Sequence, residues 1–331
     1  MPFVGGKRMY VINEKNVQEA LNMDEAVQVI ENALTKYQSG KYKQPERTFS
    51  SIEHENNLLI MPCFVEDCVG LKVVTSYPSN GELNNNVPVT QGTVLIHDIQ
   101  TGTPLSLING TTLTAIKTGA VSGVAMKYFQ SEATSVGLVG TGLQGMYQLI
   151  AAISTTKVRT IYLYNRTFDK IKLFIDDMRK VAGNDISFVP VVDIKDLIEK
   201  SHIIITATTS LSPVLPNEDI YENKLVVAVG SYKSNMRELP KRLFKSAEYF
   251  YIDSSDGKNE CGDIIDPLEN KWVKEKNVIL LSDIVTKNKQ KHENAEPIVF
   301  KSVSMALFDT MIGNYIYKKA KNNNLGTEVS F

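Results

Sequence analysis

The stretch SVGLVGTGLQGMYQLIAA, residues 135–152, has three parts that together predict a fold. Residues 135–139 form a short apolar run that is typical of a buried strand. Three glycines follow in the spacing G-x-G-x-x-G, at Gly140, Gly142 and Gly145. The residues after Gly145 have apolar positions at helical spacing. We therefore expect a strand, a tight glycine turn and a helix in direct succession.

Strands and helices continue to alternate after this stretch. Short apolar runs occur in TIYLYN, ISFVPV, HIIITAT, KLVVAVGS and EYFYID, and helical patterns occur in FDKIKLFIDDMRKVAG and DIKDLIEK. Strands that alternate with helices predict a parallel sheet that is covered on both faces. The fold class is therefore α/β, with a doubly wound Rossmann domain over residues 119–302.

The remaining sequence has a different pattern. Residues 17–39 predict one amphipathic helix that ends at Gly40. Residues 47–109 contain short β-rich runs separated by Asn, Gly and Pro, which predict a β-meander with a hairpin turn at residues 100–102. A further helix is expected over residues 111–129, and the segment 300–319, FKSVSMALFDTMIGNYIYKK, predicts one long helix. Residues 1–118 together with 303–331 thus form a β-rich α+β domain.

Composition excludes several classes of protein. Of the 331 residues, 43% are hydrophobic, and the formal net charge of -1 lacks the basic excess of a nucleic-acid-binding protein. No run of 18 apolar residues and no signal-peptide pattern occurs, so we expect a cytoplasmic protein without a membrane span. The three cysteines, Cys63, Cys68 and Cys261, are interpreted as reduced thiols, and no metal-binding motif is present.

The glycine turn favours a dinucleotide site because of its context. In such a turn, the first glycine permits the tight bend, the second lets the backbone approach a pyrophosphate, and the third allows close packing of helix on strand. The amino end of the helix then offers free N–H groups to the phosphates. The alternative is a purely structural turn without a ligand.

The end of the next strand bears on the choice of cofactor. An NAD site usually offers an acidic residue to the ribose 2′-hydroxyl, whereas a 2′-phosphate favours arginine. Here the sequence is Tyr164-Asn165-Arg166-Thr167, with no acid at the tip. Arg166 and Thr167 can donate hydrogen bonds to a phosphate, so NADP is favoured. Asp169 lies two residues further on and keeps NAD open as an alternative.

Ten segments, in this order along nearly the whole chain, carry a resemblance to a known family. They are QPERTF (44–49), GLKVVTSY (70–77), NVPVTQGTVLI (86–96), LTAIKTGAVS (113–122), GTGLQG, YNRT, ITATTSLSPVL, AVGSYKSNMREL (228–239), YIDS with the later ECGDI, and FKSVSMALFDT. Together they resemble the ornithine cyclodeaminase/mu-crystallin family, most closely its mu-crystallin-type ketimine reductases.

The resemblance implies a β-rich domain that forms a homodimer, a Rossmann domain, and an active site in the cleft between the two. Members of the family are cyclodeaminases, alanine dehydrogenases and reductases of cyclic imines such as pyrroline- and piperideine-2-carboxylate. All of them act on a carbon that bears both nitrogen and a carboxylate. The implied partner of this chain is therefore a small amino acid or cyclic imine, with neither nucleic acid nor membrane involved.

Four residues are implied in catalysis. Arg47, Lys72 and Lys117 match the positions where the family grips the substrate carboxylate, and Lys72 is the candidate general acid. Lys117 departs from the family's usual arginine and loses its two-pronged contact. Tyr232 occupies the position of an aspartate that cyclodeaminases and the related alanine dehydrogenases use for the substrate amine. Since a tyrosine is neutral near pH 7, this departure favours the reductase branch.

The cofactor residues follow from the same resemblance. They are Gly140, Thr141, Gly142, Leu143, Gln144, Gly145, Asn165, Arg166, Thr167, Thr118, Thr206, Ala207, Thr208, Val229, Gly230 and Ser302. Ser302 begins the motif S-x-G that the family places near the nicotinamide, and Ser304 replaces its glycine here.

The sequence thus predicts an NADPH-dependent reductase that converts a small cyclic imine 2-carboxylate to a cyclic amino acid. Three alternatives remain open. They are an ornithine cyclodeaminase that holds NAD and releases ammonia and proline, an alanine-type amino-acid dehydrogenase, and a non-catalytic carrier of the cofactor. The presence of Arg47 and Lys72 favours chemistry over storage.

Overall fold

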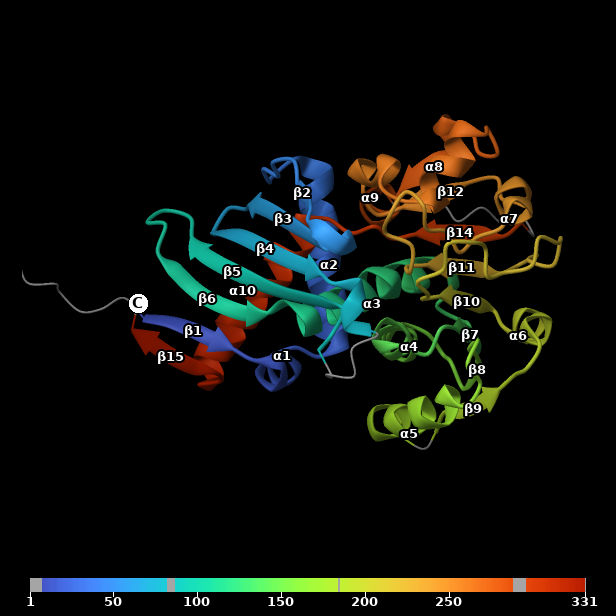
Figure 1. Cartoon of the computed structure of the whole chain (residues 1–331), viewed down its shortest axis with the longest axis horizontal. Coiled ribbons are helices and arrows are strands. Elements are labelled where there is room, and N and C mark those ends of the chain that lie inside the picture. Colours follow the sequence, from blue (N-terminus) through green and yellow to red (C-terminus); the bar gives the residue numbers. More distant parts are fainter. Residues whose placement is uncertain (1–7, 82–86, 184, 288–295, 331) are drawn as a thin grey trace, which may run out of the picture. The chain divides into compact units, whose positions relative to one another are not determined.

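A computed structural model of the chain describes residues 8–81, 87–183, 185–287 and 296–330 (Figure 1). The chain divides into two compact units. Unit 1 consists of Met1–Lys117 and Met305–Phe331, and unit 2 consists of Thr118–Ser304. Each unit has a sheet of its own.

Unit 2 contains an eight-stranded sheet in the order β13-β12-β14-β11-β10-β7-β8-β9, and every strand pair in it is parallel. Its strands are β7 (Ser135–Val139), β8 (Thr160–Tyr164), β9 (Ser187–Pro190), β10 (Ile203–Thr206), β11 (Leu225–Ala228), β12 (Phe250–Ile252), β13 (Val278–Leu280) and β14 (Ile298–Lys301). The chain runs outward from β7 through β8 to β9 and then returns to the other side of β7 at β10 (Figure 1). This reversal is the topological switch point of a doubly wound sheet, so the predicted fold class is confirmed.

Every residue of β7, β10 and β11 is buried, as expected for the central strands of a parallel sheet that is covered on both faces. The helices of unit 2 are α4 (Leu143–Thr155), α5 (Lys170–Ala182), α6 (Ile194–Lys200), α7 (Lys241–Ser246), α8 (Gly262–Glu269) and α9 (Leu281–Lys287), and α3 (Gly110–Gln130) runs from unit 1 into unit 2. Strands β7 and β8 are the predicted VGLV and TIYLY runs, and their carboxyl ends lead into the glycine turn and the cofactor loop.

Unit 1 contains a seven-stranded sheet in the order β15-β1-β6-β5-β4-β3-β2. Its strands are β1 (Arg8–Ile12), β2 (Thr48–Ser51), β3 (Asn57–Phe64), β4 (Cys68–Ser76), β5 (Thr90–Asp98), β6 (Pro104–Asn109) and β15 (Thr327–Ser330). Neighbours from β2 to β6 pair antiparallel, which confirms the predicted meander. The hairpin turn between β5 and β6 forms where it was expected, since the Thr101 N–H donates to Asp98 Oδ1 (2.8 Å) and Gly102 has a positive φ of 68°.

The helix predicted over residues 17–39 is two helices, so this prediction was wrong. They are α1 (Glu14–Ala20) and α2 (Met23–Ser39). Asn22 begins α2 with a capping box: its side chain accepts from the Glu25 N–H at 2.9 Å, and Glu25 Oε2 accepts from the Asn22 N–H at 3.3 Å. This exchange satisfies two N–H groups and ends the helical path before α2 begins.

The helix predicted over residues 300–319 starts too early in the sequence. Residues 298–301 instead form β14, which lies between β11 and β12, and α10 (Ala306–Asn323) begins five residues later. Ser304 has a φ of +68°, which a right-handed helix cannot contain. Helix α10 packs on β3, β4, β5 and α2 of unit 1.

All three cysteines are free and buried, as expected for reduced thiols. Burial raises the pKa of Cys63 and of Cys68 to about 12. These thiols are therefore protonated and unreactive at neutral pH.

Candidate active site

The glycine turn has the geometry that its spacing predicts. Gly140 directly follows β7 and has a φ of +103°, and a Cβ there would lie 2.6 Å from the Ala207 carbonyl oxygen. A Cβ at Gly145 would lie 2.3 Å from the Gly140 carbonyl oxygen, so only glycine lets α4 pack this closely on the turn. These two glycines are therefore required by the backbone itself.

Gly142 is different, because no atom lies within 4 Å of the position where its Cβ would be. It is also the N-cap residue of α4, and no side chain caps that helix. The N–H groups of the first turn of a helix are natural donors to phosphate. Beside them, Thr141 Oγ1 and Gln144 Oε1 are buried without a hydrogen-bond partner in the described part of the chain. Open space at Gly142 and unsatisfied polar atoms around it fit a dinucleotide pyrophosphate.

The loop after β8 presents the residues expected at the cofactor ribose. Asn165 Oδ1 accepts from the Thr141 N–H at 3.4 Å, and Asn165 Nδ2 donates to the Thr167 carbonyl at 2.8 Å. Asn165 thus ties the loop to the glycine turn, while Arg166 and Thr167 are exposed. Asp169 lies at the N-cap position of α5, but its side chain makes no capping hydrogen bond.

A buried carboxylate holds the strand ends beside the turn. The Glu238 carboxylate accepts from the Thr208 N–H (2.7 Å), the Thr208 hydroxyl (2.8 Å) and the Gly230 N–H (2.7 Å). It therefore joins the ends of β10 and β11, where Ala207 and Val229 also lie. The sequence prediction missed Glu238, although it belongs to the quoted MREL motif. The feature of the sequence that could have identified Glu238 is that it is the acidic residue of this motif.

A second buried network supports Glu238. Asp263 accepts from the Glu238 N–H at 3.0 Å and from the Ser231 hydroxyl at 2.6 Å. Lys301, at the end of β14, donates to the Ser231 carbonyl at 2.8 Å. Burial raises the pKa of Glu238, while the charge of Lys301 acts in the opposite direction. These hydrogen bonds fix the backbone at Ser231, just after β11, and at Glu238.

Asp253, directly after β12, likewise holds a neighbouring backbone segment, the one that follows β14. Its carboxylate accepts from the Ser302 hydroxyl (2.6 Å), the Val303 N–H (3.1 Å) and the Ser304 N–H (2.9 Å). These bonds hold Ser304 in the left-handed region that favours glycine, even though serine has replaced glycine there. Asp253 was also missed; it ends the quoted YID run.

In unit 1, two predicted residues come together on a third that was not predicted. Lys72 Nζ lies 2.9 Å and Lys117 Nζ 3.5 Å from Asp309 Oδ1. The side chains of the three residues are only 6%, 1% and 1% exposed, respectively. Lys72 is on the face of β4 that α10 covers, where Gly70 allows the helix to approach: a Cβ at Gly70 would lie 2.1 Å from Thr310 Oγ1.

The other predicted residues lie elsewhere in the two units. Arg47 is half-buried just before β2 in unit 1. Thr118 follows Lys117 in α3 and is partly buried, and Thr206 is fully buried at the end of β10 with no hydrogen-bond partner for its hydroxyl among the described residues. Tyr232 belongs to unit 2, is 51% exposed, and has the Lys233 ammonium 5.6 Å from its ring centre. The structure therefore joins Lys72 with Lys117 and places Tyr232 in the other unit.

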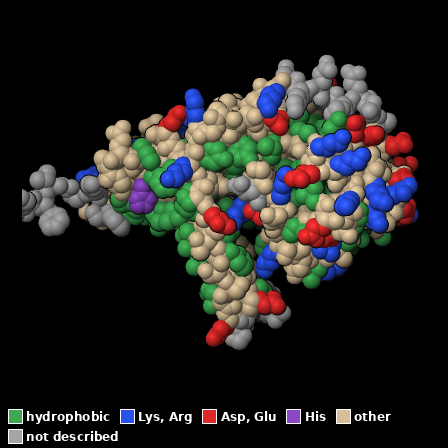
Figure 2. Space-filling view, turned by 90° about the horizontal axis from the view of Figure 1, so that it is seen from above, with side chains coloured by type: hydrophobic (Ala, Val, Ile, Leu, Met, Phe, Trp, Pro, Cys, Tyr) green, Lys and Arg blue, Asp and Glu red, His purple; other side chains and the backbone are tan. Residues whose placement is uncertain are grey.

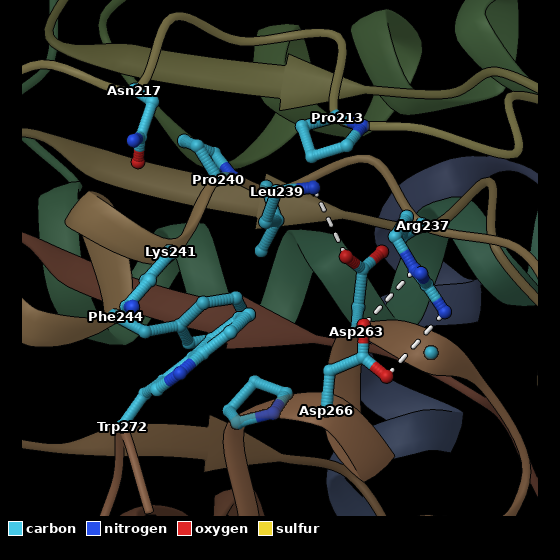
Figure 3. Close-up of a pocket in the computed structure, with 12 residues that line it drawn as sticks. Pro213, Asn217, Arg237, Leu239, Pro240, Lys241, Phe244, Asp263, Asp266 and Trp272 are labelled. Carbon is cyan, nitrogen blue, oxygen red and sulfur yellow. Dashed lines mark hydrogen bonds and ion pairs between the residues drawn. The ribbon is translucent and has the colours of Figure 1, made fainter. Parts of the chain in front are cut away.

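A pocket of about 270 Å³ in unit 2 is separate from these residues (Figure 3). Trp272, Phe244 and Leu239 form its apolar wall, and Arg237 is paired with Asp266 at its edge. None of the predicted cofactor or substrate residues lines it.

The described residues contain no cluster of three or more His, Cys, Asp or Glu side chains that could hold a metal ion. On the face shown in Figure 2, positive and negative side chains of the described residues are interspersed. None of the helices described here combines the length and the apolar character needed to cross a bilayer.

Comparisons with known proteins extend along nearly the whole chain. Residues 7–324 match the sequence profile of the ornithine cyclodeaminase/mu-crystallin family. A Bacillus cereus protein named Delta(1)-pyrroline-2-carboxylate reductase is 32% identical over 98% of this chain and 100% of its own. The structure of Thermococcus litoralis Delta(1)-pyrroline-2-carboxylate reductase in complex with NADH and L-proline is 32% identical, with a TM-score of 0.91 over 97% of this chain and 100% of that one.

A more distant structure has the same fold. An archaeal alanine dehydrogenase dimer with bound NAD is 24% identical, with a TM-score of 0.89, over 98% of this chain and 100% of that chain. The family expected from the ten sequence segments is confirmed by these matches.

Proposed function

Because the chain belongs to the ornithine cyclodeaminase/mu-crystallin family, we propose that it is an NAD(P)H-dependent reductase of a small cyclic imine 2-carboxylate. Pyrroline-2-carboxylate and piperideine-2-carboxylate are the substrates to test, and proline and pipecolate are the corresponding products. The observation that carries the proposal is the buried pair of lysines on Asp309, which supplies both a proton donor and positive charge. The names of the relatives that are 32% identical over the full chain agree with it.

The chain's own residues divide the work between binding and proton transfer. Lys117 and Arg47 bind the substrate carboxylate, each charge-assisted hydrogen bond contributing about 1.5–3 kcal/mol. Lys72 donates a proton to the imine nitrogen. One N–H of its ammonium group forms the hydrogen bond to Asp309, which leaves two others for the substrate. The glycine turn, Asn165 and the strand ends held by Glu238 bind the nicotinamide cofactor, which when bound supplies a hydride for the imine carbon.

Tyr232 favours reduction over cyclodeamination. A cyclodeaminase must hold the ammonium group of its amino-acid substrate, and a neutral phenol offers no counter-ion to it. The buried carboxylates of Glu238 and Asp253, which belong to the same unit, are already occupied by three hydrogen bonds each. An imine substrate has no ammonium group that needs such a carboxylate.

The test is loss of absorbance at the reduced-nicotinamide band when either cyclic imine is added to the protein with NADPH or NADH. We expect one cofactor to be oxidised for each molecule of cyclic amino acid formed. If neither imine is reduced while ornithine with NAD gives ammonia, the protein is a cyclodeaminase. Saturable cofactor binding without turnover of either substrate would instead identify a carrier.

For the cofactor, we propose a preference for NADPH. The support is the exposed Arg166-Thr167 pair and the absence of an acid at residues 164–167. Replacing Arg166 with alanine should weaken NADPH binding about tenfold, since it removes a charge-assisted contact to the 2′-phosphate, and leave NADH binding unchanged. Fluorescence titration of both cofactors measures this, with Arg159→Ala, at the other end of β8, as control. Equal loss for both cofactors, or tighter binding of NADH by the unaltered protein, contradicts the preference.

We also propose a homodimer formed through unit 1. Strand β2 lies at the edge of the sheet, where β3 is its one partner among the described strands; its four residues are all exposed, Phe49 at 56%. An exposed apolar edge favours pairing with another chain. Sedimentation should give twice the mass of one chain, and Phe49→Lys should shift the equilibrium to monomer. A monomeric unaltered protein at micromolar concentration contradicts the proposal.

A further inference from the structure

Asp309 is the one acidic residue that contacts both predicted substrate lysines in the described part of the chain. It was not among the residues predicted from sequence. Its Oδ1 accepts a hydrogen bond from Lys72 Nζ at 2.9 Å, and Lys117 Nζ lies 3.5 Å away. Its Oδ2 is buried and has no hydrogen-bond partner among the described residues.

Three ionisable side chains meet in this cluster. Two ammonium groups and one carboxylate carry a formal charge of +1 at a site with almost no solvent exposure. Burying a charge is strongly unfavourable unless it is paired, so the contacts of both ammonium groups with Asp309 matter at this site. Burial alone would raise the pKa of Asp309, but the positive charges of Lys117 and Lys72 outweigh this effect and hold that pKa below its usual range. Asp309 is therefore the ionised partner of both lysines at neutral pH.

Resting on the proposed reductase function, we propose that Asp309 is a positioning residue: it fixes the Lys72 ammonium and keeps it charged for proton donation to the imine nitrogen. The same carboxylate contacts Lys117, which the proposed function assigns to the substrate carboxylate. Asp309 thereby couples the proton donor to the carboxylate site.

The packing of α10 makes this placement rigid. Thr310 lies against Gly70 of β4 with no room for a side chain there, so the adjacent Asp309 is held opposite Lys72. The nearest titratable group on β3 is Cys63, which is neutral because burial raises its pKa to about 12. No alternative anion for Lys72 is found among the described residues.

The other charged groups that α10 contacts are occupied further along the helix. Glu25 of α2 accepts from Tyr315 (2.8 Å) and Lys319 (2.7 Å). Asp67, in the turn between β3 and β4, accepts from Lys318 and from Asn314 (3.0 Å). Asp309 is thus the charged group of α10 that faces the lysines.

The test is Asp309→Asn, which keeps the side-chain shape and removes the charge. We expect kcat with the cyclic imine to fall about tenfold at pH 7, because without Asp309 a lysine loses its proton more readily. KM should stay the same or decrease, since positive charge remains for the substrate carboxylate. The alkaline limb of the kcat profile should move at least one pH unit lower, and cofactor binding should change less than twofold.

Asp67→Asn is the matched control, because it removes another ion pair of α10. Its pH profile should overlie that of the unaltered protein. Asp309→Glu keeps the carboxylate, so its alkaline limb should stay in place even if kcat decreases. A folded Asp309→Asn protein with an unshifted profile, or one in which KM rises while kcat is unchanged, overturns the inference.

A readout that needs no turnover separates this inference from the proposed function. In protein labelled with ¹³C at the lysine ε-carbon, the Lys72 signal is assigned by its absence from Lys72→Met. Its titration midpoint should fall by at least one pH unit in Asp309→Asn and stay in place in Asp67→Asn. If the unaltered protein reduces no imine, the proposed function fails whatever this titration shows. If the midpoint does not move, the role of Asp309 fails even when turnover is present.

Discussion

Replacing Lys72 with methionine is expected to lower kcat for the cyclic imine by about 100- to 10,000-fold, the usual contribution of a positioned general acid. Methionine keeps most of the aliphatic stem in a site where the Lys72 side chain is only 6% exposed, and it removes the proton donor. Asp309 keeps Lys117 as its partner, so the fold should persist. Stopped-flow or steady-state kinetics at the reduced-nicotinamide band measure the loss.

Binding of the cofactor separates a catalytic loss from a general one. The residues expected to bind it belong to unit 2, whereas Lys72 belongs to unit 1, so its dissociation constant should change less than about twofold. Lys318→Met is the control. Lys318 is a half-exposed lysine on the same helix as Asp309, and it pairs with Asp67. Turnover that survives in Lys72→Met would show that another group donates the proton.

Replacing Gly142 with alanine is expected to weaken binding of NADPH or NADH about 100-fold while leaving thermal stability nearly unchanged. The added methyl group would meet no protein atom within 4 Å, and φ at this residue is -103°, which alanine adopts freely. It would enter the space that the pyrophosphate is expected to occupy. Calorimetric titration with each cofactor, together with thermal denaturation, measures the two effects separately.

Gly145→Ala provides the contrast. There the added carbon would lie 2.3 Å from a backbone oxygen, so both stability and cofactor binding should decrease. If the turn serves only the fold, Gly145→Ala should lower stability, whereas Gly142→Ala should change neither stability nor cofactor binding. That pattern would remove the basis for a dinucleotide at this turn.

Local patterns in the sequence predict the part of the fold that local chemistry determines. The glycine spacing predicts the bend after β7, since Gly140 and Gly145 meet backbone oxygens wherever a side chain would be added. Alternating strand and helix patterns predict the parallel sheet of unit 2, and the antiparallel meander of unit 1 is equally visible. Each of these features depends on residues close together in the chain.

Features that depend on distant residues could not be predicted in the same way. Lys72 and Asp309 are 237 positions apart, and nothing near Asp309 in ALFDT indicates which cation it meets. Residues 298–301 pair with β11 and β12, which lie well upstream, so the local pattern before α10 predicts helix where a strand forms. Asn22 shows a local failure: its capping box divides two helices that share one apolar periodicity.

The central claim is that this chain directs a hydride to the imine carbon, and isotope transfer tests it most directly. The protein would be incubated with pyrroline-2-carboxylate and reduced cofactor carrying two deuterium atoms at nicotinamide C4, and the product examined by mass spectrometry and NMR. We expect proline with one deuterium, at the carbon that bears the carboxylate, and none in the product made with unlabelled cofactor. Proline without deuterium at that carbon, or no proline with either reduced cofactor, would contradict the account.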